Sequence, residues 1–127
     1  MTEPEFLEPD VVLFVHDQAL REYGGMHGLE DEGLLHSALG RPVNKLAYAE
    51  PGSLDLAAAY AYGLASNHAF NDANKRTAWA CCVLFLKVNG VELDMPAAVV
   101  VERMPLLAAG RLDEAGFAAW LRDCRRA

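Results

Sequence analysis

The sequence predicts an all-α protein, and three observations carry that prediction. Apolar residues recur at three- and four-residue spacing in several segments, as on one face of a helix. Prolines, glycines and capping residues mark the ends of these segments, and no segment shows the convincing alternation of a strand. With 127 residues, of which 53% are hydrophobic, residues 1–127 are expected to form a single domain.

The first predicted helix begins at Pro9-Asp10, where a proline suits the first turn, and ends at Gly24-Gly25. We expect His16-Asp17 on this helix to be a hydrogen-bonded structural pair. The apolar face of this first helix is expected to consist of Val11, Val12, Val15, Ala19 and Tyr23. The glycines that follow, ending at Gly28, do not have the spacing of a phosphate-binding loop and indicate a turn.

A short second helix is expected over residues 31–39, because acidic residues open it and Gly40 follows it. Residues 41–51 have a proline near either end and no apolar periodicity. We expect them to form an exposed loop or a small hairpin. Such a segment could cover a site as a flap or serve only as a connector, and the residues fit both alternatives.

Two apolar helices come next. Ser53 is expected to cap the first, with Asp55 in its first turn, and the apolar stripe of this helix ends at His68. The second is expected to begin near Asn74. Residues 77–86 contain no charge and are almost entirely apolar, so this helix is expected to be buried on all sides and central to the fold.

The chain is predicted to end with two more helices. Pro96 opens the first of them, and Pro105 is expected to break or kink it. Asp113 is expected to cap the second. The C-terminal end of that helix is basic, which suits the helix dipole better than it suits a binding patch, and contains Arg122, Arg125 and Arg126.

The net charge and the cysteine content argue against several kinds of binding function and against a disulfide-stabilised fold. A net charge of -7 argues against general nucleic-acid binding and against an anionic membrane surface. Three cysteines, with Cys81 and Cys82 adjacent, provide neither a disulfide framework nor metal-ligand spacing and are expected to lie in the core. Without an apolar stretch of signal-peptide length at the N-terminus, the protein is expected to be cytoplasmic.

One nonapeptide, residues 68–76, gathers an imidazole, a carboxylate, two amides and two cations between the two central helices. The free N–H groups at the start of the second helix, with the positive end of its dipole, predict an anion site. Lys75 and Arg76 in a first turn oppose the dipole. Their presence makes sense if a multiply charged anion, such as the phosphate chain of a nucleotide, binds there.

These residue types suit phosphoryl or nucleotidyl transfer. His68 can accept a proton from a hydroxyl near neutral pH, and Asp72 can hold Mg²⁺ together with substrate phosphates. Asn74, Lys75 and Arg76 can bind phosphate oxygens. Phe70 is expected to be a structural anchor of the loop. Taken singly, His68 would be a core histidine and Asp72 a helix cap, but this does not explain the two cations.

The nonapeptide His-Ala-Phe-Asn-Asp-Ala-Asn-Lys-Arg resembles the signature of the Fic/Doc family, His-x-Phe-x-Asp/Glu-Gly/Ala-Asn-Gly/Lys-Arg. Its Asn-Lys-Arg ending is similar to that of the Doc (death on curing) toxins of toxin–antitoxin modules, and the similarity extends over about residues 10 to 95. The resemblance implies a compact helical fold. It also implies that His68 is the catalytic base, that Asp72 holds Mg²⁺, and that residues 74–76 bind ATP.

The chain departs from the usual family pattern at Lys75, where that pattern has Gly, and at Trp79, where it has a second Arg. The usual family reaction is AMP transfer from ATP to a protein hydroxyl. Doc toxins with the same Lys act as protein kinases on a threonine of the translation factor elongation factor Tu, which arrests translation. The resemblance therefore implies a kinase; an AMP transferase and a non-catalytic module that binds a nucleotide or a partner are the alternatives.

Control is expected to come from a partner. Some Fic proteins inhibit themselves through a Ser/Thr-x-x-x-Glu-Gly/Asn helix, but Gly28 stands at the Ser/Thr position before Glu32-Gly33. The motif is therefore absent. The resemblance implies a separate, Phd-like antitoxin whose C-terminal segment folds onto the toxin.

Overall fold

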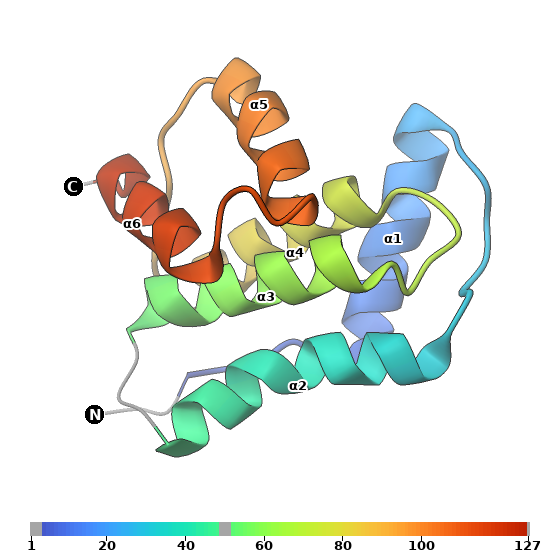
Figure 1. Cartoon of the computed structure of the whole chain (residues 1–127), viewed down its shortest axis with the longest axis horizontal. Helices are drawn as coiled ribbons and strands as arrows, with labels where there is room; N and C mark the ends of the chain where they lie inside the picture. Colours follow the sequence, from blue (N-terminus) through green and yellow to red (C-terminus); the bar gives the residue numbers. More distant parts are fainter. Residues whose placement is uncertain (1–3, 49–51, 127) are drawn as a thin grey trace.

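The computed structural model describes residues 4–48 and 52–126, and these residues confirm the all-α prediction (Figure 1). In this part of the chain the only β-type pairings are two isolated bridges, Leu29 with Phe70 and Leu93 with Arg125. None of its helices is long and apolar enough to cross a membrane. The helices are α1 (Pro9–Tyr23), α2 (Glu32–Tyr48), α3 (Ser53–Asn67), α4 (Asn74–Val88), α5 (Ala97–Ala108) and α6 (Glu114–Cys124).

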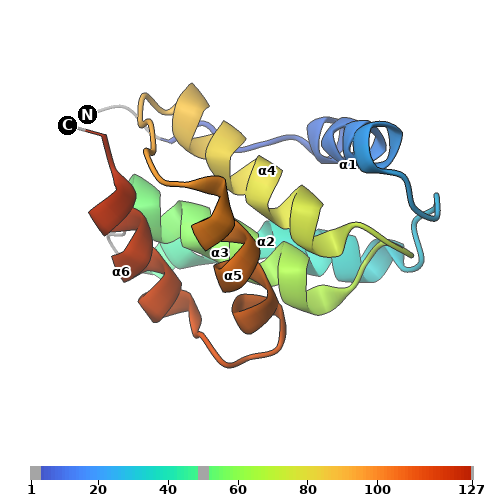
Figure 2. The same ribbon diagram turned by 90° about the horizontal axis from the view of Figure 1, so that it is seen from above.

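The centre of the fold is α3, which packs against α2, α4, α5 and α6 (Figures 1 and 2). Its ten buried residues include five alanines and Gly63, so neighbouring helices can approach it closely. The prediction that residues 77–86 are buried on all sides was wrong. One face of α4 is buried, whereas its other face, which carries Trp79 and Val83, is only half-buried.

Two helix interruptions expected at prolines do not occur. Helix α2 continues through Pro42 to Tyr48, so residues 41–48 form neither a loop nor a hairpin, and residues 49–51 lie outside the described part. Pro42 provides no N–H for the carbonyl of Ala38, but that carbonyl lies against Gly63, where a Cβ would come within 3.0 Å of it. Helix α5 likewise continues through Pro105 to Ala108.

The helix ends mostly follow the sequence signals. Asp113 caps α6 as predicted and accepts a hydrogen bond from the N–H of Gly116 at 2.7 Å. Helix α3 starts at Ser53, but its N-cap is Gly52 rather than Ser53. The N–H of Gly52 donates to the carboxylate of Asp55 at 3.0 Å. The acidic residue in the first turn therefore satisfies the N–H group of the N-cap residue.

The three cysteines are buried and unpaired, as predicted. Burial raises the pKa of the Cys81 thiol to about 12 and that of Cys82 still further. Both thiols are therefore protonated at neutral pH and behave as small core side chains.

Candidate active site

The loop between α3 and α4 is bounded by two residues in the left-handed conformation. His68 (φ 54°) ends α3 and Ala73 (φ 63°) precedes α4, and no other non-glycine residue of the described chain has a positive φ. The chain thus reverses between two packed helices. The reversal brings five of the six predicted residues together with Asn71 and Ala73 around one cavity of about 280 Å³, which is lined by His68, Asn71, Asp72, Ala73, Asn74, Lys75 and Arg76.

Phe70 points away from this cavity and into the core, where it is 2% exposed, in keeping with its predicted structural role. Asn74 holds the backbone of Phe70 at both ends. Its Oδ1 accepts from the N–H of Phe70 at 3.1 Å, and its Nδ2 donates to the carbonyl of Phe70 at 2.9 Å. The Asn74 side chain, predicted to bind phosphate, is therefore engaged in shaping the loop. Its backbone N–H, at the first position of α4, has no partner within the helix.

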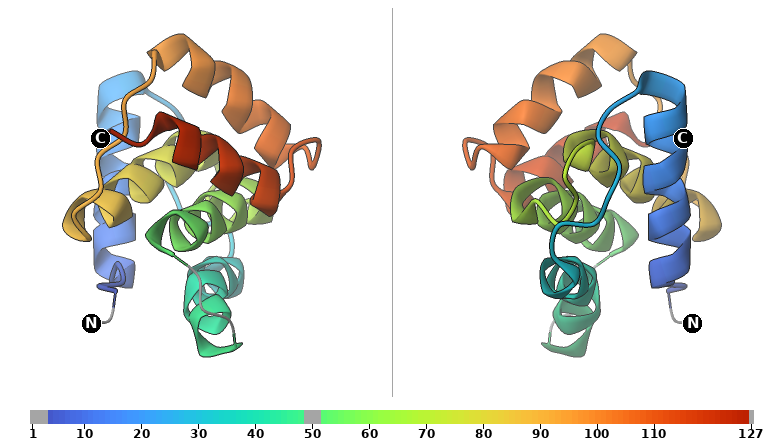
Figure 3. Two further views of the ribbon diagram at one scale, coloured as in Figure 1. Left: turned by 90° about the vertical axis from the view of Figure 1, so that its left-hand side faces the viewer. Right: turned by 90° about the vertical axis from the view of Figure 1, so that its right-hand side faces the viewer.

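The segment between α1 and α2, residues 24–31, runs beside this loop (Figure 3, right). The N–H groups of Glu30 and Asp31 donate to the carbonyl of Ala69 at 2.8 and 3.1 Å. Asn71 donates through its backbone N–H to Gly28 at 3.1 Å and through Nδ2 to the carbonyl of His27 at 3.2 Å. The segment that covers the loop is therefore residues 24–31, and residues 41–48, considered above as part of a flap, belong to α2.

Two glycines permit this close approach. Gly25 (φ +131°) lies so near Asp72 that a Cβ there would be 2.8 Å from the Asp72 Oδ2. A Cβ on Gly28 (φ +119°) would be 2.6 Å from Nδ2 of Asn71. The sequence pattern suggested only a turn at these glycines. The signal that could have indicated more was the concentration of three glycines in five residues.

Asp72 is held through both carboxylate oxygens. Oδ2 accepts from the N–H of Met26 at 3.1 Å and Oδ1 from the N–H of Ala73 at 2.8 Å. These two hydrogen bonds, and to a smaller extent the charge of Arg76, hold the pKa of Asp72 below its ordinary value. The carboxylate is therefore ionised at neutral pH and keeps further lone pairs for a cation.

The two cations of the motif have different surroundings. Arg76 is half-buried and donates to the carbonyls of Gly24 at 3.2 Å and Ala19 at 3.5 Å, and its Cζ lies 5.3 Å from the centroid of the Tyr23 ring. Lys75 is exposed, and the described residues offer its ammonium group no hydrogen bond or ion pair. Lys75 is thus the cation of this helix end that remains available to a bound anion.

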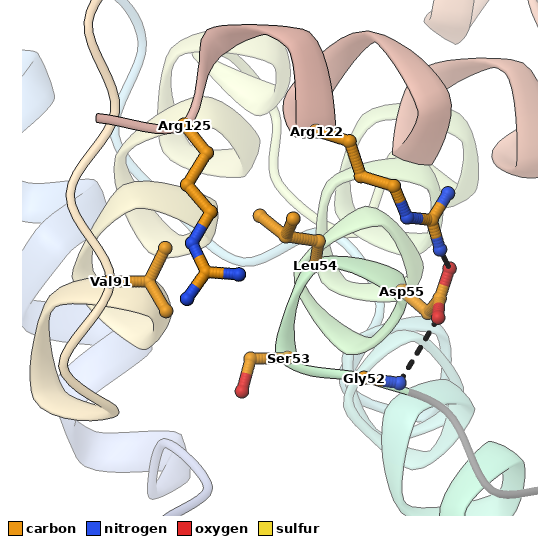
Figure 4. Close-up of a pocket in the computed structure, with 7 residues that line it drawn as sticks. All are labelled: Gly52, Ser53, Leu54, Asp55, Val91, Arg122 and Arg125. Carbon is orange, nitrogen blue, oxygen red and sulfur yellow. Dashed lines mark hydrogen bonds and ion pairs between the residues drawn. The ribbon is translucent and has the colours of Figure 1, made fainter. Parts of the chain in front are cut away.

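Two further hollows lie outside the motif. An apolar groove of about 810 Å³ runs between α1, α4 and α5 and reaches the motif at Lys75 and Arg76. A cavity of about 400 Å³ lies at the N-terminus of α3, where Figure 4 shows Arg125 pointing inward. There Arg122 forms an ion pair with Asp55, and the Asp55 carboxylate also accepts a hydrogen bond from the N–H of Gly52. The charge of Arg122 is therefore neutralised within the protein.

Comparisons with known proteins found one matching family model and two relatives. The family model described as the Fic/DOC family matches residues 6–86. "Protein kinase doc" of Escherichia phage P1 is 39% identical over 92 residues, which cover 71% of this chain and 73% of the phage protein. "Toxin Doc" of Mycolicibacterium smegmatis is 43% identical over 91 residues, covering 70% of this chain and 68% of that protein. The chain belongs to the Fic/DOC family.

Proposed function

We propose that this protein is the toxin of a toxin–antitoxin pair. In this proposal it is a protein kinase that transfers the γ-phosphate of ATP to a threonine hydroxyl of a translation factor such as elongation factor Tu, and thereby arrests translation. Family membership supports the proposal, as do the names of the two relatives, a protein kinase and a toxin. The observation that carries the choice of reaction is Lys75.

Lys75 occupies the second position of α4, where the usual Fic pattern has glycine. Its side chain takes space that the α-phosphate would need for AMP transfer, and it adds a charge that suits a terminal phosphate. Trp79 replaces the second arginine of the pattern and lines the apolar groove instead. The far end of a triphosphate bound in the AMP-transfer orientation would therefore lack a guanidinium group, and the reversed orientation of ATP is favoured.

The residues around the cavity then have distinct roles. His68 takes the proton of the target hydroxyl as its oxygen attacks the γ-phosphorus. The bond from that phosphorus to the bridging oxygen breaks, and ADP leaves with the electron pair. Lys75, Arg76 and the free N–H groups of the first turn of α4 bind the oxygens of the transferred phosphate.

Mg²⁺ fits this site only with help from the nucleotide. The described residues contain no cluster of three acidic, histidine or cysteine side chains that could hold a metal ion. The ionised Asp72 would be its single protein ligand, with phosphate oxygens and water completing the shell, as is common for Mg²⁺. When bound, Mg²⁺ would neutralise charge on the phosphates.

The test is incubation with Mg²⁺, elongation factor Tu and ATP labelled at the α or the γ position. We expect γ-label on the factor, and its loss with Asp72→Ala and with His68→Ala. His36→Ala is the matched control, because His36 is an exposed histidine on α2, remote in sequence from the motif. Transfer of α-label would instead establish an AMP transferase. Binding of ATP without transfer to any protein would indicate a non-catalytic module.

We also propose that the antitoxin binds in the apolar groove between α1, α4 and α5. Phe14, Tyr23 and Val101 on the groove are 56%, 66% and 73% exposed, which is unusual for large apolar side chains. The groove fits the apolar face of an amphipathic helix, and it ends at the two cations of the motif. A C-terminal antitoxin segment with an acidic residue at that end would therefore block the nucleotide site.

Substitution in the middle of the groove tests this second proposal. Val101→Asp is expected to abolish inhibition by the antitoxin while phosphate transfer stays at the wild-type level, because Val101 does not line the motif cavity. Inhibition that persists in Val101→Asp at the wild-type antitoxin concentration would place the antitoxin elsewhere.

A further inference from the structure

We infer that His16 is a positioning residue for Asp72, an inference that rests on the proposed function. His16 lies on α1, 56 residues before Asp72, and is 5% exposed. It does not form the predicted pair with Asp17, which instead accepts a hydrogen bond from Arg21 at 2.8 Å. The imidazole points across the interface between α1 and the motif loop.

The ring makes two contacts with that loop. Its Nε2 lies 2.9 Å from the backbone carbonyl oxygen of Asp72. Because a carbonyl can only accept, this nitrogen carries the proton and donates it. The same ring stacks on Phe70, with 3.8 Å between the ring centroids and an angle of 11° between the planes. One side chain thus holds the residues on either side of Asn71.

With His16 included, three different atoms of Asp72 are fixed. The carbonyl oxygen accepts from His16, Oδ2 from the N–H of Met26, and Oδ1 from the N–H of Ala73. Two of these donors belong to α1 and the segment that follows it. If the imidazole is lost, the peptide group after Asp72 can rotate, and the carboxylate swings away from the direction in which a cation is bound.

Packing alone would not require a histidine here. An apolar ring would fill the same volume, stack on Phe70, and cost less free energy to bury than an imidazole. His16 and Thr77 are both buried polar side chains, and the Thr77 hydroxyl has no hydrogen-bond partner among the described residues. The hydrogen bond to Asp72 therefore distinguishes His16 from a residue that only fills the core.

Two variants separate the functions of the ring. His16→Phe keeps the stacking and removes the donor, whereas His16→Gln keeps a donor and removes the ring. For phosphate transfer, we expect His16→Phe to lower kcat about tenfold and to raise the Mg²⁺ concentration for half-maximal rate severalfold, with the KM for the target protein unchanged. His16→Gln is expected to recover most of the kcat. Asp17→Asn, on the same helix, is the control.

A second measurement does not depend on catalysis. The N–H of Met26 donates to the Asp72 carboxylate, so its hydrogen exchange, followed by NMR, reports on the position of that carboxylate. We expect exchange at Met26 to rise about tenfold in His16→Phe and to stay near the wild-type rate in His16→Gln. The amide of Leu64, a buried residue in the C-terminal half of α3, should not change in either variant.

The two measurements also separate the two proposals. If the wild-type protein transfers no phosphate, the proposed function fails, while exchange at Met26 still decides the role of His16. Wild-type kcat together with wild-type exchange at Met26 in His16→Phe would overturn the inference. A loss of kcat that His16→Gln shares in full, with Leu64 exchange also raised, would show that His16 acts only through stability.

Discussion

The N-termini of α3 and α4 carry opposite charges at their third helical residue. Both helices have 15 residues, and arginine side chains lie at both N-terminal ends, Arg122 and Arg125 from the C-terminal end of the chain at α3 and Arg76 of the helix itself at α4. The third residue of α3 is Asp55, which accepts the N–H of Gly52 and pairs with Arg122. The third residue of α4 is Arg76, and its first turn has no acidic residue. The first end has a carboxylate in its own first turn, whereas the second has none there, and its nearest carboxylate, Asp72, lies in the loop before the helix.

The other described helices support this contrast. Helix α6 begins with Glu114, which pairs with Arg41 at 2.8 Å and Lys45 at 2.5 Å, and α1 and α2 have acidic residues in their first turns. Among the helices described, cations occupy the first turn of α4 alone. Because cations there oppose the dipole, this end forgoes some stability. A bound polyphosphate would supply the missing negative charge.

The strongest test reverses the charge at the N-terminal end of α4. Lys75→Glu should weaken ATP binding more than a hundredfold, because it changes the local charge by two units beside the phosphates. The same change should stabilise the free protein by about 0.5 kcal/mol, since Glu suits the first turn of a helix. Calorimetry measures the expected loss of ATP affinity, and thermal unfolding measures the expected gain in stability of the free protein. Weaker binding accompanied by a lower Tm would indicate damage to the fold and contradict the comparison.

The next test concerns the segment that packs on the α4 end. Gly25→Ala should destabilise the protein by about 2 kcal/mol and abolish phosphate transfer, because the added Cβ meets Asp72 Oδ2 at 2.8 Å and Leu20 at 2.9 Å. Gly24→Ala is the matched control. Gly24 also has a positive φ, but its Cβ would meet nothing within 4 Å, so it should cost about 1 kcal/mol and retain activity. Urea unfolding and the γ-label assay measure both.

A smaller effect is expected at the N-terminal end of α3. Asp55→Ala removes the acceptor for Gly52 and the partner of Arg122, and should cost about 1 kcal/mol of stability without changing ATP affinity. Asp123→Ala, an exposed aspartate on α6, should change stability by less than about 0.5 kcal/mol. Reduced ATP affinity in Asp55→Ala would show that the two helix ends are not independent.

The smallest effect is expected at Glu114, and it should depend on pH. Burial raises the pKa of Glu114, but the hydrogen bonds and the positive charges of Lys45 and Arg41 together outweigh burial and leave this pKa below its ordinary value. The ionised Glu114 therefore adds stability above the pKa that it has when unfolded, and this stability is lost as pH falls through the folded-state pKa. Glu114→Gln should cost about 0.5 to 1 kcal/mol at pH 7 and less below about pH 4. Urea unfolding at several pH values measures this, and a cost that grows on acidification would contradict the assignment.

The sequence by itself determined the helical class, most helix ends and the position of the candidate site. Pro9, Asn74, Pro96 and Asp113 mark helix starts through signals that act within four residues. The polar residues of the motif are close together in sequence, so their gathering around one cavity needed only the reversal between α3 and α4. Local rules failed where tertiary packing was decisive. Pro42 lies inside α2, and the carbonyl of Ala38, which receives no N–H from Pro42, lies against Gly63.

The tertiary structure decided what each motif residue contacts. The Asn74 amide holds Phe70, Met26 holds the carboxylate of Asp72, and His16 reaches the same residue from α1. The last two contacts join residues 46 and 56 positions apart. Helix caps depend on neighbours along the chain, and a sequence therefore displays them directly. Hydrogen bonds across such separations depend on how α1 packs against α4, which is fixed only when the whole core forms.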